Sequence, residues 1–146
     1  MASANDVLTA KGNHPIHCIP TSATVLEATR KMNEQKIGAL VVTDGDRVVG
    51  IFTERDVLRR VVVSQMMPDQ VRIEEVMTRD VICCTPETDL DEISAIMKTR
   101  RVRHVPICTN DGRLCGLVSI GDVNAHYASN QQQTIHFLND YIYGRV

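Results

Sequence analysis

The chain has 146 residues and a mass of 16.3 kDa, which suits one compact domain or two small ones and excludes two large independent domains. With 43% apolar residues, 23% charged residues and a formal charge of −2, it has the composition of a folded globular protein. The balanced charge argues against bulk nucleic-acid binding. No apolar run approaches the roughly 18 residues of a membrane helix, and the start lacks a basic and apolar leader. We therefore expect a cytoplasmic protein without membrane contact.

The N-terminal part of the chain predicts a leading segment followed by a first structural unit. The segment covers residues 1–15, with a short helix expected over 5–10. The unit covers residues 16–60 and begins with an extended stretch that ends at Pro20. This extended stretch is short, and a proline stands at its end.

A helix, a β-hairpin and a second helix are predicted to follow within this unit. Thr24-x-x-Glu27 is a capping box, which begins the first helix. Two runs rich in β-branched residues, 39–42 and 48–52, flank a polar turn that contains glycine. The second helix begins at Thr53. The predicted order of elements in this unit is therefore β-α-β-β-α.

The second half of the chain repeats the first. After a connector over 61–80, residues 81–124 show the same order of signals, with Asp89-x-x-Glu92 in the place of the first capping box. Each predicted sheet has one face that it cannot bury alone, so we expect an α/β (α+β) fold in which the two repeats pack through their sheets with pseudo-twofold symmetry. The corresponding residues are Glu27 and Glu92, Arg47 and Arg113, Gly50 and Gly116, and Asp56 and Asp122.

The tail over 125–146 is predicted to be helical. Its apolar residues recur at helical spacing, which is typical of a helix that docks onto the body or onto a second subunit. These residues are Ile135, Leu138, Tyr141 and Ile142.

The strongest short motif is Gly-x-x-[Thr/Ser]-x-x-Asp, which runs from Gly50 to Asp56 and from Gly116 to Asp122 at predicted strand-to-helix junctions. One interpretation is helix capping. The other is a nucleotide site, because a helix N-terminus attracts phosphate and a carboxylate accepts ribose hydroxyls. The use of aspartate favours the second, since its side chain is shorter than that of the glutamate in the other boxes and reaches less far toward the cap.

These motifs, together with residues 37–42 and 102–107, resemble a tandem CBS-domain pair, the Bateman module, over about residues 16–124. The whole chain is similar to small stand-alone CBS-pair proteins. The resemblance implies adenine-nucleotide sensing without catalysis, in two related clefts between the repeats.

The resemblance implies a set of ligand-binding residues for the first of these clefts, which we call the Asp122 cleft. Asp122 would anchor the ribose, Ser119 would donate near it, and the base would lie among Ile37, Gly38 and the segment around His17. Arg103 and His104 add a cation and a titratable ring, for which the first repeat has only Gly38 and Ala39. We therefore expect this cleft to be the better phosphate site. Lys98, Arg100 and Arg101 fit a solvated helix end equally well.

The second cleft, the Asp56 cleft, has the equivalent residues. Asp56 would anchor the ribose beside Thr53, and Arg55 fits either a ligand contact or a surface helix position. The base would contact Val102, Arg103 and the segment 78–82, whose ends are Thr78 and Ile82.

Other residue clusters predict no chemistry. The five cysteines are odd in number and scattered, which argues against a disulfide scaffold. Cys83-Cys84 lacks the Cys-x-x-Cys spacing of a redox motif, which favours a packing role for this pair. His14-x-x-His17-Cys18 has no second ligand pair at zinc-like spacing, so no metal site is expected.

The sequence thus predicts no enzyme and no catalytic cofactor. The expected regulatory ligand is an adenine nucleotide, AMP first, with ATP, ADP, NAD(H) or S-adenosylmethionine as alternatives. A homodimer and a regulated protein partner are also expected. The rival hypothesis is a ligand-free module for protein interaction or dimerisation.

Overall fold

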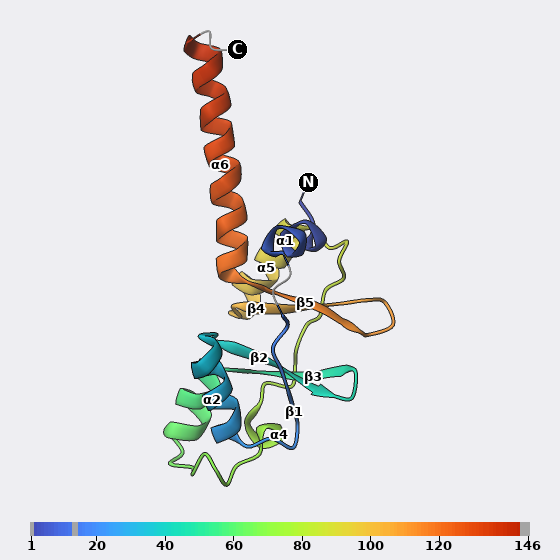
Figure 1. Ribbon diagram of the computed structural model, residues 1–146, viewed down its shortest axis with the longest axis vertical. Helices are drawn as coiled ribbons and strands as arrows, with labels where there is room; N and C mark the ends of the chain where they lie inside the picture. Colours follow the sequence, from blue (N-terminus) through green and yellow to red (C-terminus); the bar gives the residue numbers. More distant parts are fainter. Residues whose placement is uncertain (1, 13–14, 144–146) are drawn as a thin grey trace.

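The computed structural model describes residues 2–12 and 15–143 and shows two small sheets with helices outside them (Figure 1). The α2 and α4 helices lie beyond one sheet, α1 and α5 lie beyond the other, and α6 projects away from the body. This arrangement confirms the mixed α/β class. The elements are α1 (Ala4–Lys11), β1 (Cys18–Pro20), α2 (Val25–Gln35), β2 (Ala39–Asp44), β3 (Arg47–Thr53), α3 (Glu54–Asp56), the π-helix η1 (Val57–Val62), α4 (Ile73–Val76), α5 (Leu90–Arg100), β4 (His104–Cys108), β5 (Leu114–Ser119) and α6 (Ile120–Tyr143).

The first sheet has the order β1-β2-β3, with β1 parallel to β2 and β2 antiparallel to β3. The β2–β3 turn contains Gly45 at φ 63°, a backbone angle that glycine adopts without steric cost. The predicted hairpin is therefore confirmed.

The second sheet contains only β4 and β5, and the strand expected near residues 81–85 is reduced to one bridge between Cys84 and Ile107. In the first sheet the amide of Val41 donates to the carbonyl of His17 at 3.1 Å. The residue that corresponds to Val41 is Pro106, which has no N–H to donate. The proline thus removes one ladder bond and shortens the pairing.

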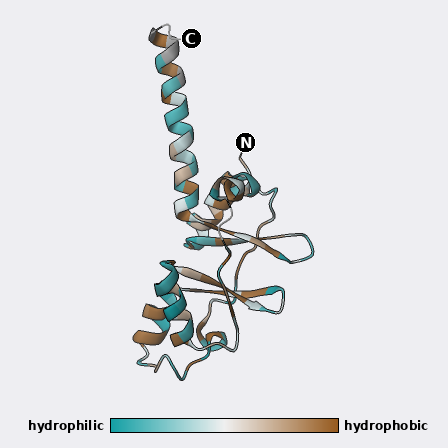
Figure 2. Cartoon of the chain, in the orientation of Figure 1, coloured by the Kyte–Doolittle hydropathy of each residue, from teal (hydrophilic) through white to brown (hydrophobic). Residues whose placement is uncertain are grey.

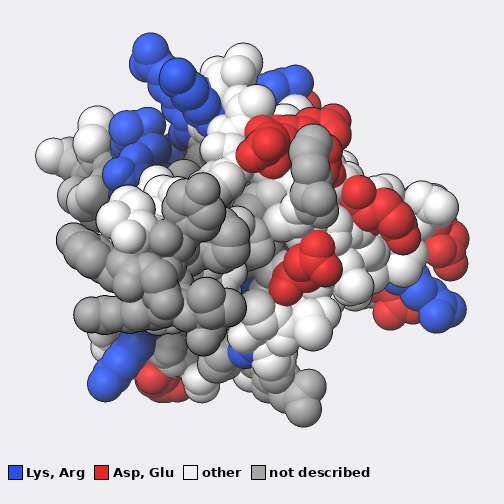
Figure 3. Space-filling view, turned by 90° about the horizontal axis from the view of Figure 1, so that it is seen from above, with Lys and Arg blue, Asp and Glu red and all other residues white. Residues whose placement is uncertain are grey.

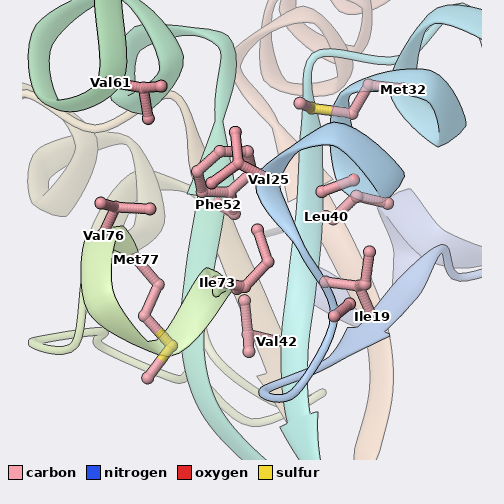
Figure 4. Packing of buried hydrophobic residues seen from close by; sticks show 12 residues of the cluster. Ile19, Val25, Met32, Leu40, Val42, Phe52, Val61, Ile73, Val76 and Met77 are labelled. Atoms are coloured by element: carbon pink, nitrogen blue, oxygen red, sulfur yellow. The ribbon is translucent and has the colours of Figure 1, made fainter. Parts of the chain in front are cut away.

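Each sheet is covered by its own apolar core. In the first core, α2 places Val25, Ala28 and Met32 against Leu40 and Phe52 of the sheet (Figure 4). The hydropathy colouring shows apolar residues within both sheets and frequent polar residues along α6 (Figure 2). In the second core, Leu90, Ile93 and Met97 of α5 pack against Val105, Ile107 and Val118 of the strands.

The helices α2 and α5 begin differently although their sequences look alike. Thr24 and Glu27 form the predicted capping box, with both hydrogen bonds at 3.1 Å. Asp89 makes no side-chain cap. Its helix is instead bound by the N-terminal segment, because the amide of Leu90 donates to the carbonyl of Ala2 at 2.9 Å. The predicted leading helix, α1, therefore belongs to the second repeat in space.

The predicted tail helix is confirmed as far as Tyr143, but only its first turns pack on the body of its own chain, and its described side chains beyond them are exposed. Ile135, Leu138 and Ile142 are 58%, 49% and 66% exposed, and the side chain of Tyr141 lies outside the described residues. Near its start the helix is attached to α5 by a hydrogen bond from the Tyr127 hydroxyl to Asp91. Within residues 2–12 and 15–143, no helix has the length and apolarity that a bilayer crossing requires.

Candidate functional site

Two cavities lie between the repeats. The Asp56 cleft has a volume of about 480 Å³ and the Asp122 cleft about 550 Å³, and small-molecule sites typically have roughly 300–1,000 Å³. Both cavities are lined by residues of both repeats, and Gly38 and His104 line both of them. A ligand in either cavity would therefore touch both halves of the fold.

The Asp56 carboxylate is held by contacts from its own helix and from the connector. Its Oδ2 accepts from the Thr53 amide at 3.0 Å, and its Oδ1 accepts from the Thr78 hydroxyl at 3.2 Å. The Nε of Arg60 lies 3.5 Å from Oδ1. Asp56 is only 7% exposed, so it is a buried, paired acid at the N-terminus of a helix.

Thr78 reaches Asp56 because the connector pairs with β3. The amide of Thr78 donates to the carbonyl of Ile51 at 2.9 Å, and the amide of Ile51 donates to the carbonyl of Thr78 at 3.0 Å. This close approach requires Gly50, because a Cβ there would lie 2.8 Å from the Thr78 oxygen. Gly50, in the middle of β3, thus allows the connector to pair with this strand and to bring Thr78 to Asp56.

The Asp122 carboxylate is bound by a residue that the sequence analysis did not assign to the site. The Nζ of Lys11, at the end of α1, lies 2.9 Å from Oδ2 of Asp122 and 2.9 Å from the carbonyl of Leu117. The Ser119 amide also donates to Oδ2, at 2.8 Å. Burial raises the pKa of Asp122, but the Ser119 and Lys11 contacts outweigh it, so the pKa lies below its ordinary value.

Leu8 of α1 also enters the Asp122 cleft. A Cβ on Gly116 would lie 2.6 Å from Leu8 Cδ2, which shows how closely α1 covers β5. Leu8 and Lys11 both line this cavity. No local signal in the sequence could have placed them there, because they are more than a hundred residues away from Gly116 and Asp122 in the chain.

The argument from aspartate length was wrong, because both aspartates close a capping box. The Thr53 amide donates to Asp56 at 3.0 Å and the Asp56 amide to Thr53 Oγ1 at 3.3 Å. The matching distances for Ser119 and Asp122 are 2.8 and 3.1 Å. Aspartate at this position spans the cap as well as glutamate does at Thr24, so capping alone accounts for both carboxylates. A ligand role must rest on the cavities instead.

Arg103 was expected on both clefts and lies on only one of them. Arg103 lines the Asp56 cleft and not the Asp122 cleft, whereas His104 lines both. The cationic side chain that was expected beside Asp122 therefore lines the other cavity. More arginines line the Asp56 cleft than the Asp122 cleft.

Apart from Asp122, the remaining expected residues line the cavities in which the two-cleft interpretation put them. Those on the Asp56 cleft are Thr53, Arg55, Asp56, Thr78, Ile82 and Val102. Those on the Asp122 cleft are His17, Ile37, Gly38 and Ser119. Asp122 itself does not line this cavity, because its carboxylate lies behind Lys11 and Ser119, which bind it and line the cavity in its place. Four arginines on the Asp56 cleft were not assigned to it from the sequence: Arg59, Arg60, Arg100 and Arg101.

His104 lies between the two groups of charges. Burial lowers its pKa, Asp122 raises it, and Lys11, Arg103 and Arg55 lower it further, so the net pKa is below the ordinary value. The ring is therefore neutral at pH 7. It can accept or donate one hydrogen bond in either cleft without adding charge.

The described residues contain no group of three or more His, Cys, Asp or Glu side chains arranged to hold a metal ion. His14 lies outside the described residues. All five cysteines are free thiols, and burial is the largest cause that raises the pKa of Cys108 to about 12.

Comparisons with known proteins agree with one another. A family model described as "CBS domain" matches residues 5–63 and 73–129. The chain is 33% identical over 149 residues to the mitochondrial CBS domain-containing protein CBSX3 of Arabidopsis thaliana, covering 96% of this chain and 71% of that protein.

Two solved structures extend the similarity to the fold. One is a putative signal-transduction protein with CBS domains from Burkholderia ambifaria, with a TM-score of 0.84, 36% identity, and coverage of 89% of this chain and 96% of that one. The other is a CBS domain protein from Pyrobaculum aerophilum complexed with AMP, with a TM-score of 0.74, 23% identity, and coverage of 83% and 89%.

Proposed function

The chain belongs to the CBS-domain family, and on that premise we propose that it is a non-catalytic regulatory module that binds an adenine nucleotide in the Asp56 cleft. The observation that carries the proposal is a cavity between the repeats, which is lined by arginines of both repeats and by the buried Asp56. The AMP complex of the Pyrobaculum relative supports the class of ligand. AMP is the nucleotide that the family resemblance puts first.

Each part of the nucleotide has matching groups in the cleft. Asp56 would accept the ribose hydroxyls, with Thr78 as a second polar contact. Ile82 and Val102 supply an apolar surface for the base. Arginine guanidinium groups bind phosphate oxygens in pairs.

Occupancy would be transmitted through the relative position of the two repeats. The ligand would contact α3 and η1 of the first repeat and the end of α5 in the second. The bound ligand would favour the arrangement of the two repeats that it binds more tightly. The size of this population shift is limited by the difference in the ligand's affinity for the two arrangements. A protein partner that contacts both repeats would sense the shift.

The Asp122 cleft is the weaker site in this proposal. Asp122 does not line the cavity, Lys11 binds its carboxylate, and Leu8 covers the adjoining strand. A nucleotide would have to displace these contacts, which would reduce its affinity. Asp56 is also paired, but it lines its own cavity.

A thermal-shift titration of the purified chain tests the proposal. A ligand at a hundred times its dissociation constant adds about 2.7 kcal/mol to the stability, which is about 5–10 °C for a domain of this size. Asparagine still accepts the cap hydrogen bond, so both Asp56→Asn and Asp122→Asn should keep the fold. Asp56→Asn should abolish the ligand-induced shift in melting temperature, and Asp122→Asn should preserve it. Flat melting curves with AMP, ADP, ATP, NADH and S-adenosylmethionine would disprove nucleotide binding.

The second candidate is an interaction module without a ligand, and the exposed apolar stripe of α6 favours it. Ile135, Leu138 and Ile142 recur at the spacing of a coiled-coil seam on a helix that projects from the body. A homodimer through this stripe would bury it. Sedimentation velocity with and without nucleotide separates the two functions: a dimer that ignores every nucleotide favours the second.

A further inference from the structure

The Asp56 cleft is lined by six arginines, three on each wall. One wall belongs to the helical segment that follows β3 in the first repeat. The other belongs to the end of α5 and the residues before β4 in the second repeat. The arginines of the first wall are Arg55, Arg59 and Arg60, and those of the second are Arg100, Arg101 and Arg103.

The acids of the cleft do not balance these cations. Only Glu54, Asp56 and Asp80 line the same cavity, so its fixed charge is about +3 when His104 is neutral. The whole chain, in contrast, carries −2. Figure 3 shows that charge is unevenly distributed over the molecule, with many acids toward the right of that view and several basic side chains at the upper left.

Most of the arginines have no carboxylate of their own. Arg60 lies 3.5 Å from Asp56, and Arg100 lies 3.6 Å from Asp80. In the part of the chain that the structure describes, the other four side chains make no ion pair or hydrogen bond. These four are Arg55, Arg59, Arg101 and Arg103.

Guanidinium groups on both walls repel one another until an anion lies between them. A monophosphate carries about two negative charges on a single group of oxygens, and each further phosphate adds about one more charge and extends the chain of oxygens. A longer phosphate chain can therefore contact both walls at once with paired guanidinium hydrogen bonds.

We infer that the Asp56 cleft is a site for a nucleoside di- or triphosphate in preference to a monophosphate, with the phosphate chain held between the two arginine walls. The inference rests on the proposed function and specifies its ligand. It also gives the ligand a mechanical role, because bound phosphates neutralise the repulsion between the first repeat and the second.

Isothermal titration of the full chain in magnesium-free buffer tests this inference, with adenosine, AMP, ADP, ATP and inorganic tripolyphosphate as probes. We expect the affinity to rise about tenfold or more with each phosphate from AMP to ATP. We also expect the binding of ATP to weaken steeply with salt, since its charges are neutralised by exposed arginines.

The outcomes distinguish this inference from the proposed function. AMP that binds as tightly as ATP overturns the inference and leaves the proposed function in place. Tripolyphosphate that binds as tightly as ATP also overturns it, because the adenosine part would then contribute nothing. The absence of binding by every nucleotide overturns both.

Arginine variants provide a second test. Arg59→Gln and Arg103→Gln remove one unpaired charge from each wall, and both side chains are exposed, so the fold should be unaffected. Each should weaken ATP about tenfold and AMP less. Lys98→Gln is the matched control, because Lys98 lies exposed on α5 and does not line the cleft. An unchanged ratio of ATP to AMP affinity in both arginine variants overturns the inference.

Discussion

Replacement of Gly50 by alanine tests the close approach on which the Asp56 cleft depends. A Cβ at this position would lie 2.7 Å from Met77 Sδ and 2.8 Å from the Thr78 carbonyl oxygen. The thioether can rotate away. The carbonyl cannot, because it accepts the Ile51 amide at 3.0 Å while the Thr78 amide donates back to Ile51 at 2.9 Å. The connector must therefore move away from β3.

The expected cost follows from the size of the clash. Overpacking of this kind costs about 1–3 kcal/mol, and the lower entropy of the unfolded alanine chain offsets about 0.4–1 kcal/mol. The net loss lies between about 0 and 2.6 kcal/mol and centres on about 1.3 kcal/mol, which is a fall in melting temperature of roughly 3–5 °C. The same movement withdraws the Thr78 hydroxyl from its 3.2 Å contact with Asp56.

Thermal unfolding and urea titration of the variant measure this loss. Gly38→Ala is the control: its Cβ would lie 2.9 Å from Glu54 Oε1, which is the mobile end of an exposed side chain. The control should differ from the parent by less than about 0.5 kcal/mol. If Gly50→Ala is as stable as Gly38→Ala, the reasoning from the close approach is refuted.

Three further predictions concern α1, Asp122 and the tail. Lys11→Ala should open the Asp122 cleft, so that calorimetry counts two nucleotides per chain instead of one; an unchanged count would show that α1 does not block it. Because the pKa of folded Asp122 is lowered, its stabilisation is present above its unfolded pKa and is lost as the pH falls through the folded pKa. The parent should therefore exceed Asp122→Asn in urea stability at about pH 6, and the difference should shrink in acid; a constant difference would contradict this. Deletion of residues 131–146 should change the melting temperature by less than about 2 °C, since the described side chains there are exposed, and a larger loss would reveal packing by the tail.

The repeated architecture could be predicted from the sequence because its signals are local. The capping box at Thr24 and the hairpin turns act over a few residues, and their recurrence in the second half supported each prediction. The same holds for Asp56 and Asp122, whose positions at strand-to-helix junctions follow from the motif. Even the shortened second sheet has a local cause in Pro106.

The charges that meet in each cleft were decided only by the tertiary structure. Lys11 reaches Asp122 because α1 packs on the second repeat, and the arginines of α3 and η1 line the same cavity as Arg100, Arg101 and Arg103 because the two repeats pack together. Such contacts join residues far apart in the chain, and no spacing or propensity encodes them. The sequence alone therefore determined the fold and the two acidic junctions, whereas packing between the repeats decided which cleft gathers cations and which is covered by the protein itself.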